Sequence, residues 1–373
     1  MAFFGAPNAF VGLDIGTSSL KLVELVNRRR RVELAAYAEA TVPNLLVNPE
    51  GADDKDEIEY TVELIKRMIE QAGVSTDIMV GALPSSTVFS TVLTMPLLPE
   101  KEMEKAVRFA ARDVVPADLE DMVLGWSRVG EQPHMATDEK GEDTKVSAPG
   151  QGGAEKKDSD RPVPVFLTAA PKKVVDRYLD VTKRIGLKLF ALEVETFPLI
   201  RSLLQEPNAS ALIVDIGDQT TTYHVIDGGT PRVSHTIEFG GAHLSQSIAD
   251  SLHVSIAEAE KKKQEHGLTD KASLEQQTAT RISVDKQVQK AVDLLALYSR
   301  QQNRQIKKTV LIGGGANLKM IKEYWAKKSG HTVQVGNPWK GLSYPEKLES
   351  RLRLIGPTYG VAVGLAERGF VQQ

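Results

Sequence analysis

The stretch VGLDIGTSSLKLVELV, residues 11–26, decides the fold, because ALIVDIGDQTTTYHVID, residues 211–227, repeats its pattern. In each copy an apolar run ends in Asp-Ile-Gly, a short polar turn follows, and a second apolar run comes after it. Two apolar runs joined by a glycine-containing turn predict a β-hairpin. Because the copies begin about 200 residues apart, they predict two related domains in one chain.

The segments that follow the two hairpins also correspond. After the first copy, RVELAAYAEAT alternates apolar and polar residues, and a helical pattern over about residues 57–72 precedes the buried strand IMVGAL at residues 78–83. After the second copy come PRVSHTIEF, helical patterns from about residue 242, and the strand TVLIGG at residues 309–314. Three strands, helical segments and a further strand, present twice, predict an α/β fold with two related mixed sheets flanked by helices.

The region between the halves predicts an inserted α+β domain. Residues 85–94 and 121–129 are strand-like, and residues 99–115 form an amphipathic helix with Met103, Val107 and Ala110 in register. Residues 130–162 contain no Leu, Ile, Phe, Tyr or Trp, so we expect them to be disordered. The strand VPVFLTAAP and a helix over about residues 172–185 complete the insertion.

The composition excludes several classes of protein. The chain has 373 residues with 41% hydrophobic and 25% charged residues, which is typical of a soluble globular protein. The absence of cysteine removes disulfides, thiolate metal sites and cysteine nucleophiles. A net charge of -3 supplies no positive field for nucleic acid. No apolar run approaches the roughly 18 residues of a membrane span, and the opening residues lack the pattern of a signal peptide, so we expect a cytoplasmic protein.

The two Asp-Ile-Gly turns are candidate phosphate sites, because a tight glycine turn presents successive backbone N–H groups to an anion. The first copy contributes Gly16, Thr17, Ser18 and Ser19, with Lys21 as a positive charge and Asp14 placed to hold a hydrated Mg²⁺. The second copy contributes Asp215, Gly217, Asp218, Gln219 and Thr220. Either copy alone is also compatible with a plain hairpin, whereas two matched copies favour a clamp on one polyphosphate.

A third element, LIGGGANLKMI at residues 311–321, is a buried strand followed by three glycines and a predicted helix. Such a turn admits a flat or charged ligand beside a helix N-terminus, and it also serves as a tight connection in many proteins. Its candidate ligand residues are Gly313, Gly314, Gly315 and Asn317.

The order of D-x-G-T-x-x-x-K, D-I-G-x-x-T and G-G-G-A resembles the phosphate 1, phosphate 2 and adenosine motifs of the actin-like (ribonuclease H-like) ATPase superfamily. The resemblance implies two α/β domains that close on ATP and Mg²⁺, with connecting helices at residues 195–204 and 355–368. It also implies that AEAEKKK, residues 257–263, borders the nucleotide through Glu260 and Lys263, and that Gly240 and Gly241 contribute to the site. Asp215 and Glu195 are the residues implied to orient water for slow ATP hydrolysis, and Asp14 and Asp215 to face the metal.

Within this superfamily the sequence resembles the PilM family of type IV pilus assembly proteins. The opening hairpin, the stretch at residues 96–112, the E-V-E-T-F region and the G-V-A-V-G-L-A ending carry the resemblance. It implies subdomain 1A at residues 1–84, 187–208 and 355–373, an inserted subdomain 1C at 85–186, subdomain 2A at 209–241 and 303–354, and subdomain 2B at 242–302. The long polar insertion at residues 130–162 departs from the family pattern.

The resemblance implies an ATP-binding platform that holds the N-terminal cytoplasmic peptide of a PilN-like inner-membrane protein, in a cleft between 1A and 1C. Segments 85–94 and 162–170 would build that surface, and the chain would meet the inner membrane only peripherally, through this partner. Two alternatives stay open. An FtsA-like division protein would self-assemble on the membrane through a C-terminal amphipathic helix, which we do not find after residues 355–368. A sugar or acid kinase would need a carboxylate base in a substrate-binding insertion, and the sequence offers no such insertion.

Overall fold

The computed structural model describes residues 8–29, 31–42, 55–128, 134–135 and 162–371. The chain divides into two compact units. Unit 1 combines residues 1–87 with residues 176–373, and unit 2 comprises Val88–Val175. In the described residues no helix is long and apolar enough to span a membrane.

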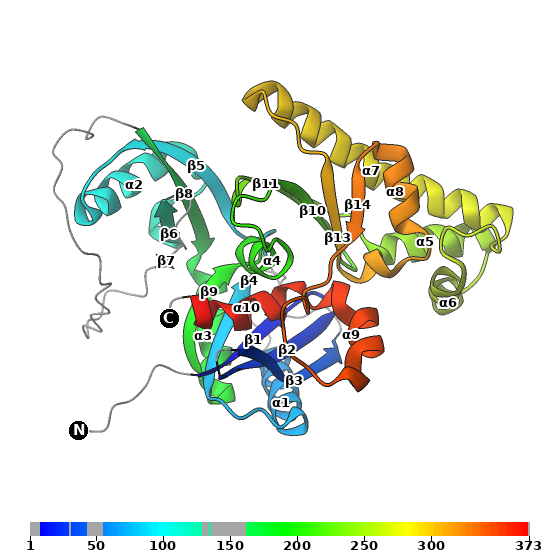
Figure 1. Ribbon diagram of the computed structural model, residues 1–373, viewed down its shortest axis with the longest axis horizontal. Helices are drawn as coiled ribbons and strands as arrows, with labels where there is room; N and C mark the ends of the chain where they lie inside the picture. Colours follow the sequence, from blue (N-terminus) through cyan, green and yellow to red (C-terminus); the bar gives the residue numbers. More distant parts are fainter. Residues whose placement is uncertain (1–7, 30, 43–54, 129–133, 136–161, 372–373) are drawn as a thin grey trace. The chain divides into compact units, whose positions relative to one another are not determined.

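Unit 1 contains two five-stranded sheets of the same topology (Figure 1). The first has the order β3-β2-β1-β4-β9, formed by Arg31–Thr41, Ser19–Arg28, Ala9–Ile15, Ile78–Leu83 and Lys188–Val194. The second has the order β12-β11-β10-β13-β14, formed by Thr230–Ile237, Thr221–Asp227, Ala211–Ile216, Lys308–Ile312 and Thr332–Val335. In both sheets the first three strands are antiparallel and the last three are parallel. The predicted internal repeat of an α/β unit is therefore confirmed.

Two helices, α4 (Thr196–Leu203) and α10 (Gly360–Val371), lie between the two sheets (Figure 1). Their apolar side chains share one core with both sheets, made of Val80, Ala82, Leu199, Ile213, Val310, Ile312, Val361 and Leu365 among others. The two helices cross closely at Gly364, where an added Cβ would lie 1.9 Å from the carbonyl oxygen of Pro198. A side chain at that position would force the helices apart.

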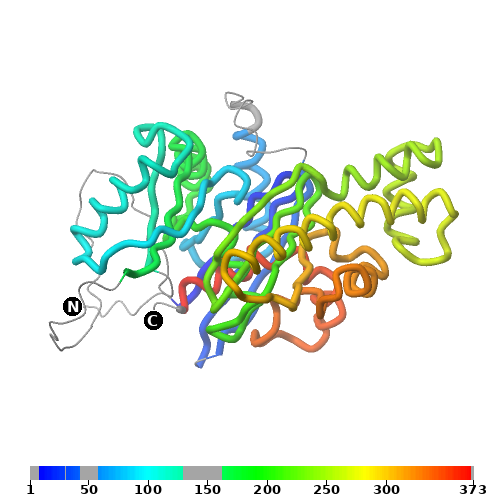
Figure 2. Tube along the Cα trace, turned by 90° about the horizontal axis from the view of Figure 1, so that it is seen from above, coloured from blue at the N-terminus to red at the C-terminus, as the bar shows by residue number. Residues whose placement is uncertain are grey.

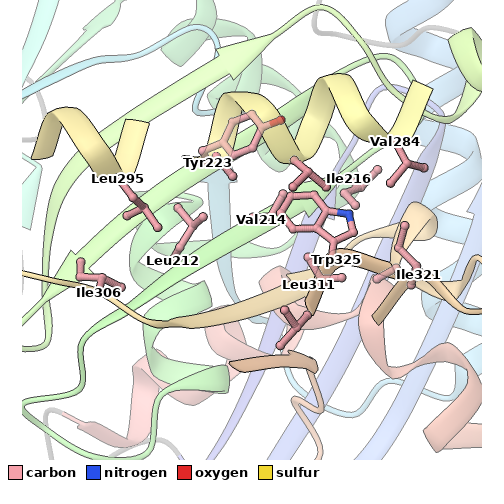
Figure 3. Packing of buried hydrophobic residues seen from close by; sticks show 14 of the residues in the cluster. Leu212, Val214, Ile216, Tyr223, Val284, Leu295, Ile306, Leu311, Ile321 and Trp325 are labelled. Atoms are coloured by element: carbon pink, nitrogen blue, oxygen red, sulfur yellow. The ribbon is translucent and has the colours of Figure 1, made fainter. Parts of the chain in front are cut away.

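Helix α1 (Lys55–Ala72) covers the first sheet at β2 and β3. The second sheet carries α5 (Gly241–Leu252), α6 (Ile256–His266), α7 (Leu274–Gln302) and α8 (Ile321–Ser329). Figure 3 shows the core beneath α7 and α8, where Trp325 packs among Leu212, Val214, Ile216, Val284 and Leu311. Helix α9 (Glu349–Ile355) precedes α10. Figure 2 shows the long run of α7 along this half of the unit.

Unit 2 has a four-stranded sheet with the order β5-β8-β6-β7. Its strands are Phe89–Pro96, Pro162–Pro171, Met122–Arg128 and His134–Met135. The amphipathic helix α2 (Glu100–Val114) packs on this sheet through Met103, Val107 and Ala111. Helix α3 (Lys172–Ile185) leads the chain from unit 2 back into unit 1.

The structure corrects several expected boundaries. The strand expected from residue 85 begins at Phe89, because Thr87 donates to the Pro84 carbonyl and closes a turn there. The expected helix after the glycines begins only at Ile321, following a short 3-10 turn. The second connecting helix is interrupted at residues 356–358 by Pro357, so α10 begins at Gly360.

The segment expected to be disordered, residues 130–162, is only partly described. His134–Met135 form β7, which pairs with β6, and Pro162 begins β8, so the expectation is wrong for these residues. Backbone hydrogen bonds can hold a strand pair together whatever side chains it carries, which explains the error. The remainder of the segment lies outside the described residues.

Candidate functional site

The first hairpin places a carboxylate opposite a lysine. Asp14 and Lys21 are cross-strand partners at the end of the β1–β2 hairpin. The turn is closed by Gly16 N–H, which donates to the Ser19 carbonyl oxygen at 3.0 Å. The Lys21 ammonium donates to the Ser19 hydroxyl and lies 3.6 Å from the Glu39 carboxylate. A buried positive charge is thereby held beside the hairpin turn.

The second hairpin has the same backbone but different side chains. Asp215 pairs with Thr222, and Gly217 N–H donates to the Thr220 carbonyl oxygen at 2.9 Å. Threonine therefore stands where the first hairpin has its lysine, so of the two hairpins only the first supplies a positive charge. Gln219 donates to Asp218 at 2.9 Å.

Both hairpins line one cavity of about 810 Å³, which lies in unit 1. Nearly all residues predicted for the site reach its wall, although they come from segments far apart in the sequence: Asp14, Gly16, Thr17, Ser18, Ser19, Lys21, Glu195, Asp215, Gly217, Asp218, Thr220, Gly240, Gly241, Glu260, Lys263, Gly313, Gly314, Gly315 and Asn317. Gln219 is the exception, since it is missing from the residues described along the wall.

Three carboxyl groups gather at one end of this cavity. Burial, followed by the charge of Asp14, raises the pKa of Glu195 to about 8 and of Asp215 to about 7. Burial also raises the pKa of Asp14, while Lys21 lowers it. Raised pKa values mean that these carboxyl groups bind protons more tightly than free ones, so an added cation would favour their ionised forms.

Another part of the wall is organised by Lys263. Its ammonium donates to the Gly241 carbonyl, the Ser245 hydroxyl and the Glu260 carboxylate at 3.0, 2.8 and 2.6 Å. An ammonium has three donors, so all are used within the protein. Burial opposes ionisation of Glu260, but the hydrogen bonds from Lys263 and Ser245 outweigh it and lower the pKa. Lys263 therefore fixes the Glu260 carboxylate and the start of α5.

The glycine-rich turn closes over the second hairpin. Gly313 has φ +80°, and its N–H donates to the Pro357 carbonyl oxygen at 2.8 Å. An added Cβ would lie 2.4 Å from Asp215 Oδ1. Only glycine lets this backbone approach Asp215 so closely.

Several wall residues escaped the sequence analysis. Leu244, Val284, Leu318 and Ile321 give the cavity an apolar region. Val284 belongs to a helical stripe that also includes Ser283 and Gln287, which reach the wall as well. In sequence this stripe is indistinguishable from a helix face that packs on a core, and the two buried polar residues were the available signal.

The donor set fits a magnesium ion better than a metal held by protein alone. In the part of the chain that is described, no group of three or more His, Cys, Asp or Glu side chains could hold a metal. Mg²⁺ commonly takes one or two carboxylates and completes its shell with water and phosphate oxygens. Asp14 and Asp215, both buried with raised pKa values, meet that requirement.

Comparison with known proteins places this geometry in context. A family model described as type IV pilus assembly protein PilM matches residues 12–148 and 152–370. A solved PilM-PilN type IV pilus biogenesis complex contains a chain that is 26% identical, with a TM-score of 0.80 over 98% of this chain and 99% of that one.

Two other solved structures share the fold. The ethanolamine utilization protein EutJ from Carboxydothermus hydrogenoformans is 18% identical, with a TM-score of 0.56 over 96% of this chain and 89% of that one. MreB5 of Spiroplasma citri bound to ADP is 14% identical, with a TM-score of 0.51 over 98% and 97%.

Proposed function

Because the chain belongs to the PilM family of type IV pilus assembly proteins, we propose that it is an ATP-binding platform for a PilN-like inner-membrane protein. The observation that carries the nucleotide part is the convergence of two phosphate-type hairpins and a glycine-rich turn on one cavity. The MreB5 structure of the same fold is a complex with ADP, which supports a nucleotide as the occupant.

In this proposal each group of wall residues has one task. The backbone N–H groups of the two hairpins and the Lys21 ammonium bind the phosphates. The Glu260 carboxylate accepts from a ribose hydroxyl, and Lys263 acts indirectly by holding Glu260. The apolar side chains of Leu244, Leu318 and Ile321 pack against the base.

The carboxyl end of the cavity would hold Mg²⁺ through Asp14 and Asp215, directly or through bound water. The ion would neutralise charge on the phosphates when it is present. In this proposal Glu195 or Asp215 accepts a hydrogen bond from a water beside the terminal phosphate, which would allow slow hydrolysis. Their raised pKa values in the ligand-free protein favour the protonated form. A bound cation would shift both groups toward the ionised form.

The partner site belongs to unit 2 in this proposal. Strand β5 lies at the edge of the sheet and pairs with β8 on one side only, among the described residues. A free strand edge accepts an extended peptide as an added strand, with main-chain hydrogen bonds for affinity and side-chain pockets for specificity. The N-terminal peptide of a PilN-like protein would bind there and attach the chain to the inner membrane peripherally.

The test is a pair of calorimetric titrations on the full chain. ATP with Mg²⁺ is titrated first, and then a synthetic peptide from the N-terminus of the PilN-like protein with and without ATP. Binding of both ligands is expected. A peptide that fails to bind near 1 mM, a limit worth about 4 kcal/mol, removes the platform and returns FtsA-like self-assembly to consideration. Absence of ATP binding removes the nucleotide part.

A further inference from the structure

One end of the second sheet lies away from the cavity. Strands β10, β13 and β14 run parallel, and residues that follow β10 and β13, such as Gly217 and Gly313, line the cavity. The first residues of these strands therefore lie at the opposite end of the sheet. Helix α7 ends there too, since only residues 303–307 separate it from β13 (Figure 1).

Basic side chains gather where α7 joins β13. Residues 294–308 contain no acidic residue and four basic ones, which we call the basic link: Arg300, Arg304, Lys307 and Lys308. The first three are exposed, and Lys308 is half-buried. Among the described residues, only Arg304 of the four has an ion-pair partner. Lys327, in the last turn of α8, adds a further exposed cation at the same end of the sheet.

The nearby carboxylates do not cancel this charge. Asp227 is 2% exposed and lies 3.0 Å from Arg304. Burial opposes ionisation of Asp227, but side-chain hydrogen bonds and the charges of Arg304 and Arg232 lower its pKa. These two arginines outweigh the one buried carboxylate. Glu206, shortly before β10, is exposed, and it still leaves this end of the sheet with a net positive charge.

Helix stability accounts for only part of the basic link. Arg300 lies in the last turn of α7, where a positive charge interacts favourably with the helix dipole. Lys307 and Lys308 lie outside any helix, and neither has an ion-pair partner among the described residues. The fold therefore gives no structural reason for these two charges.

Leu297 gives the same surface an apolar side chain. It is 52% exposed and lies one helical turn before Arg300. A large apolar side chain beside cations is typical of segments at a bilayer interface, where apolar groups enter the acyl boundary and Lys or Arg meets anionic headgroups. The phosphates of a nucleic acid also attract cations, but they gain nothing from the leucine. The combination favours a bilayer.

We infer that the basic link and Leu297 form a contact surface for the anionic face of a phospholipid bilayer. This goes beyond the proposed function, in which the chain meets the membrane only through the peptide of a PilN-like protein. The contact uses no residue of the cavity wall and no residue of unit 2.

The expected contact is weak by itself. Each Lys or Arg near an anionic bilayer favours binding about fivefold, or roughly 1 kcal/mol. A few such residues hold a protein at the membrane only when a second attachment is present. The peptide of the proposed function supplies such an attachment, so the two contacts would reinforce each other.

The test measures co-sedimentation of the full chain, without any partner, with vesicles of phosphatidylglycerol and phosphatidylcholine in equal parts. Vesicles of phosphatidylcholine alone provide the uncharged comparison. The chain should bind the anionic vesicles at low salt and not the uncharged ones. Binding should be lost at about 1 M salt, where the screening length falls to about 3 Å.

Variants locate the contact. Arg300→Gln combined with Lys307→Gln should weaken binding to the anionic vesicles about 25-fold, or roughly 2 kcal/mol, with an unchanged melting temperature. The matched control, Lys66→Gln combined with Lys261→Gln, removes two exposed cations on α1 and α6 and should bind as wild type does. Leu297→Gln should weaken vesicle binding about threefold or more, or roughly 0.7 kcal/mol.

The contrary outcomes are distinct. Absence of binding to the anionic vesicles, or an equal loss in the control pair, overturns the inference. Vesicle binding that Leu297→Gln leaves unchanged also overturns it, because a bilayer contact at this segment must bury Leu297. A chain that binds duplex DNA through Arg300 and Lys307, but no vesicle, shows a nucleic-acid surface instead. None of these results bears on the proposed nucleotide and peptide sites, because the assay contains neither ligand.

Discussion

Gly313 shows how one residue shapes the candidate site. Its φ of +80° and ψ of 177° are open to glycine almost alone, and an added Cβ would meet Asp215 Oδ1 and the Ile216 carbonyl at 2.4 and 2.5 Å. We predict that Gly313→Ala lowers the free energy of unfolding by about 2 kcal/mol or more and weakens nucleotide binding. The adjacent Gly314→Ala is the matched control, because a Cβ there meets nothing within 4 Å. If urea denaturation shows the same loss of unfolding free energy for Gly313→Ala and Gly314→Ala, this explanation of the turn is wrong.

Lys21 supplies the positive charge expected to meet phosphate. It is mostly buried, opposite Asp14 in the hairpin. Losing a charge-assisted hydrogen bond costs about 1.5–3 kcal/mol, so Lys21→Ala should weaken ATP binding roughly 10- to 100-fold in calorimetry. Lys188→Ala, which removes an exposed ion pair with Asp77, should leave the affinity as it is. Unchanged affinity in Lys21→Ala would show that the first hairpin does not bind phosphate.

For single residues, the sequence predicts site residues that belong to a repeated motif. It does not predict site residues that only tertiary packing brings together. Asp14 and Asp215 could be found because each ends a strand of a recognisable hairpin. The contact between Ser85 and Glu195 joins residues 110 positions apart, and no local pattern marks it.

Among the elements, β9, α4 and α10 are tied together by a buried group of ions. The Glu193 carboxylate accepts from Arg201 through both oxygens at 3.0 Å and lies 2.8 Å from Arg368. Removing one partner from a buried ion group costs about 3–5 kcal/mol, because the remaining charges stay desolvated. Glu193→Gln should therefore destabilise unit 1 strongly in urea denaturation. Glu59→Gln, which breaks an exposed pair with Arg184 at 3.1 Å, should cost at most about 1 kcal/mol.

Helix α10 also carries a carboxyl group that links its stability to pH. Burial raises the pKa of Glu367 to about 8 from 4.5, against the opposing charge of Arg201, and Oε2 has no hydrogen-bond partner among the described residues. Between these two pKa values the folded protein keeps a proton that the unfolded chain releases. Stability contributed by this group therefore falls as pH rises from about 4.5 to about 8, by at most about 1.4 kcal/mol per pH unit.

Glu367→Gln replaces the titrating carboxyl group with a neutral amide. The free energy of unfolding should then depend less on pH between about 4.5 and 8. We predict that the free energy of unfolding of the variant exceeds that of wild type by a margin that grows from pH 5 to pH 8 and then stays constant. Glu63→Gln, at an exposed glutamate on α1, should follow the wild-type curve. A margin that is independent of pH would mean that Glu367 is ionised in the folded protein.

At the scale of elements, the sequence predicted the existence and order of strands and helices well, because hydrophobic periodicity reports burial directly. It failed where backbone hydrogen bonds alone decide the structure, as in β7 and in the turn before β5. It also could not predict that α4 and α10 share a core with both sheets, since that packing depends on side chains from four separate segments.

The whole molecule separates its two proposed functions between its two units. Every described wall residue of the cavity, from Asp14 to Val361, belongs to unit 1. Unit 2 has its own sheet and its own core, built from Met95, Met103, Val107, Val165 and Leu167 among others. Nucleotide binding should therefore survive the loss of unit 2, whereas peptide binding should not.

A deletion tests this separation directly. Phe89 and Ala169 are paired across β5 and β8, so their Cα atoms lie about 5 Å apart and a short glycine-serine linker can replace residues 89–169. The shortened chain should bind Mg²⁺ and ATP within about threefold of the full chain, or roughly 0.7 kcal/mol, and should no longer bind the PilN-like peptide. Circular dichroism establishes that unit 1 remains folded, since its sheets and helices are all retained. A folded deletion protein that loses ATP binding would show that the cavity depends on unit 2, and one that still binds the peptide would move the partner site to unit 1.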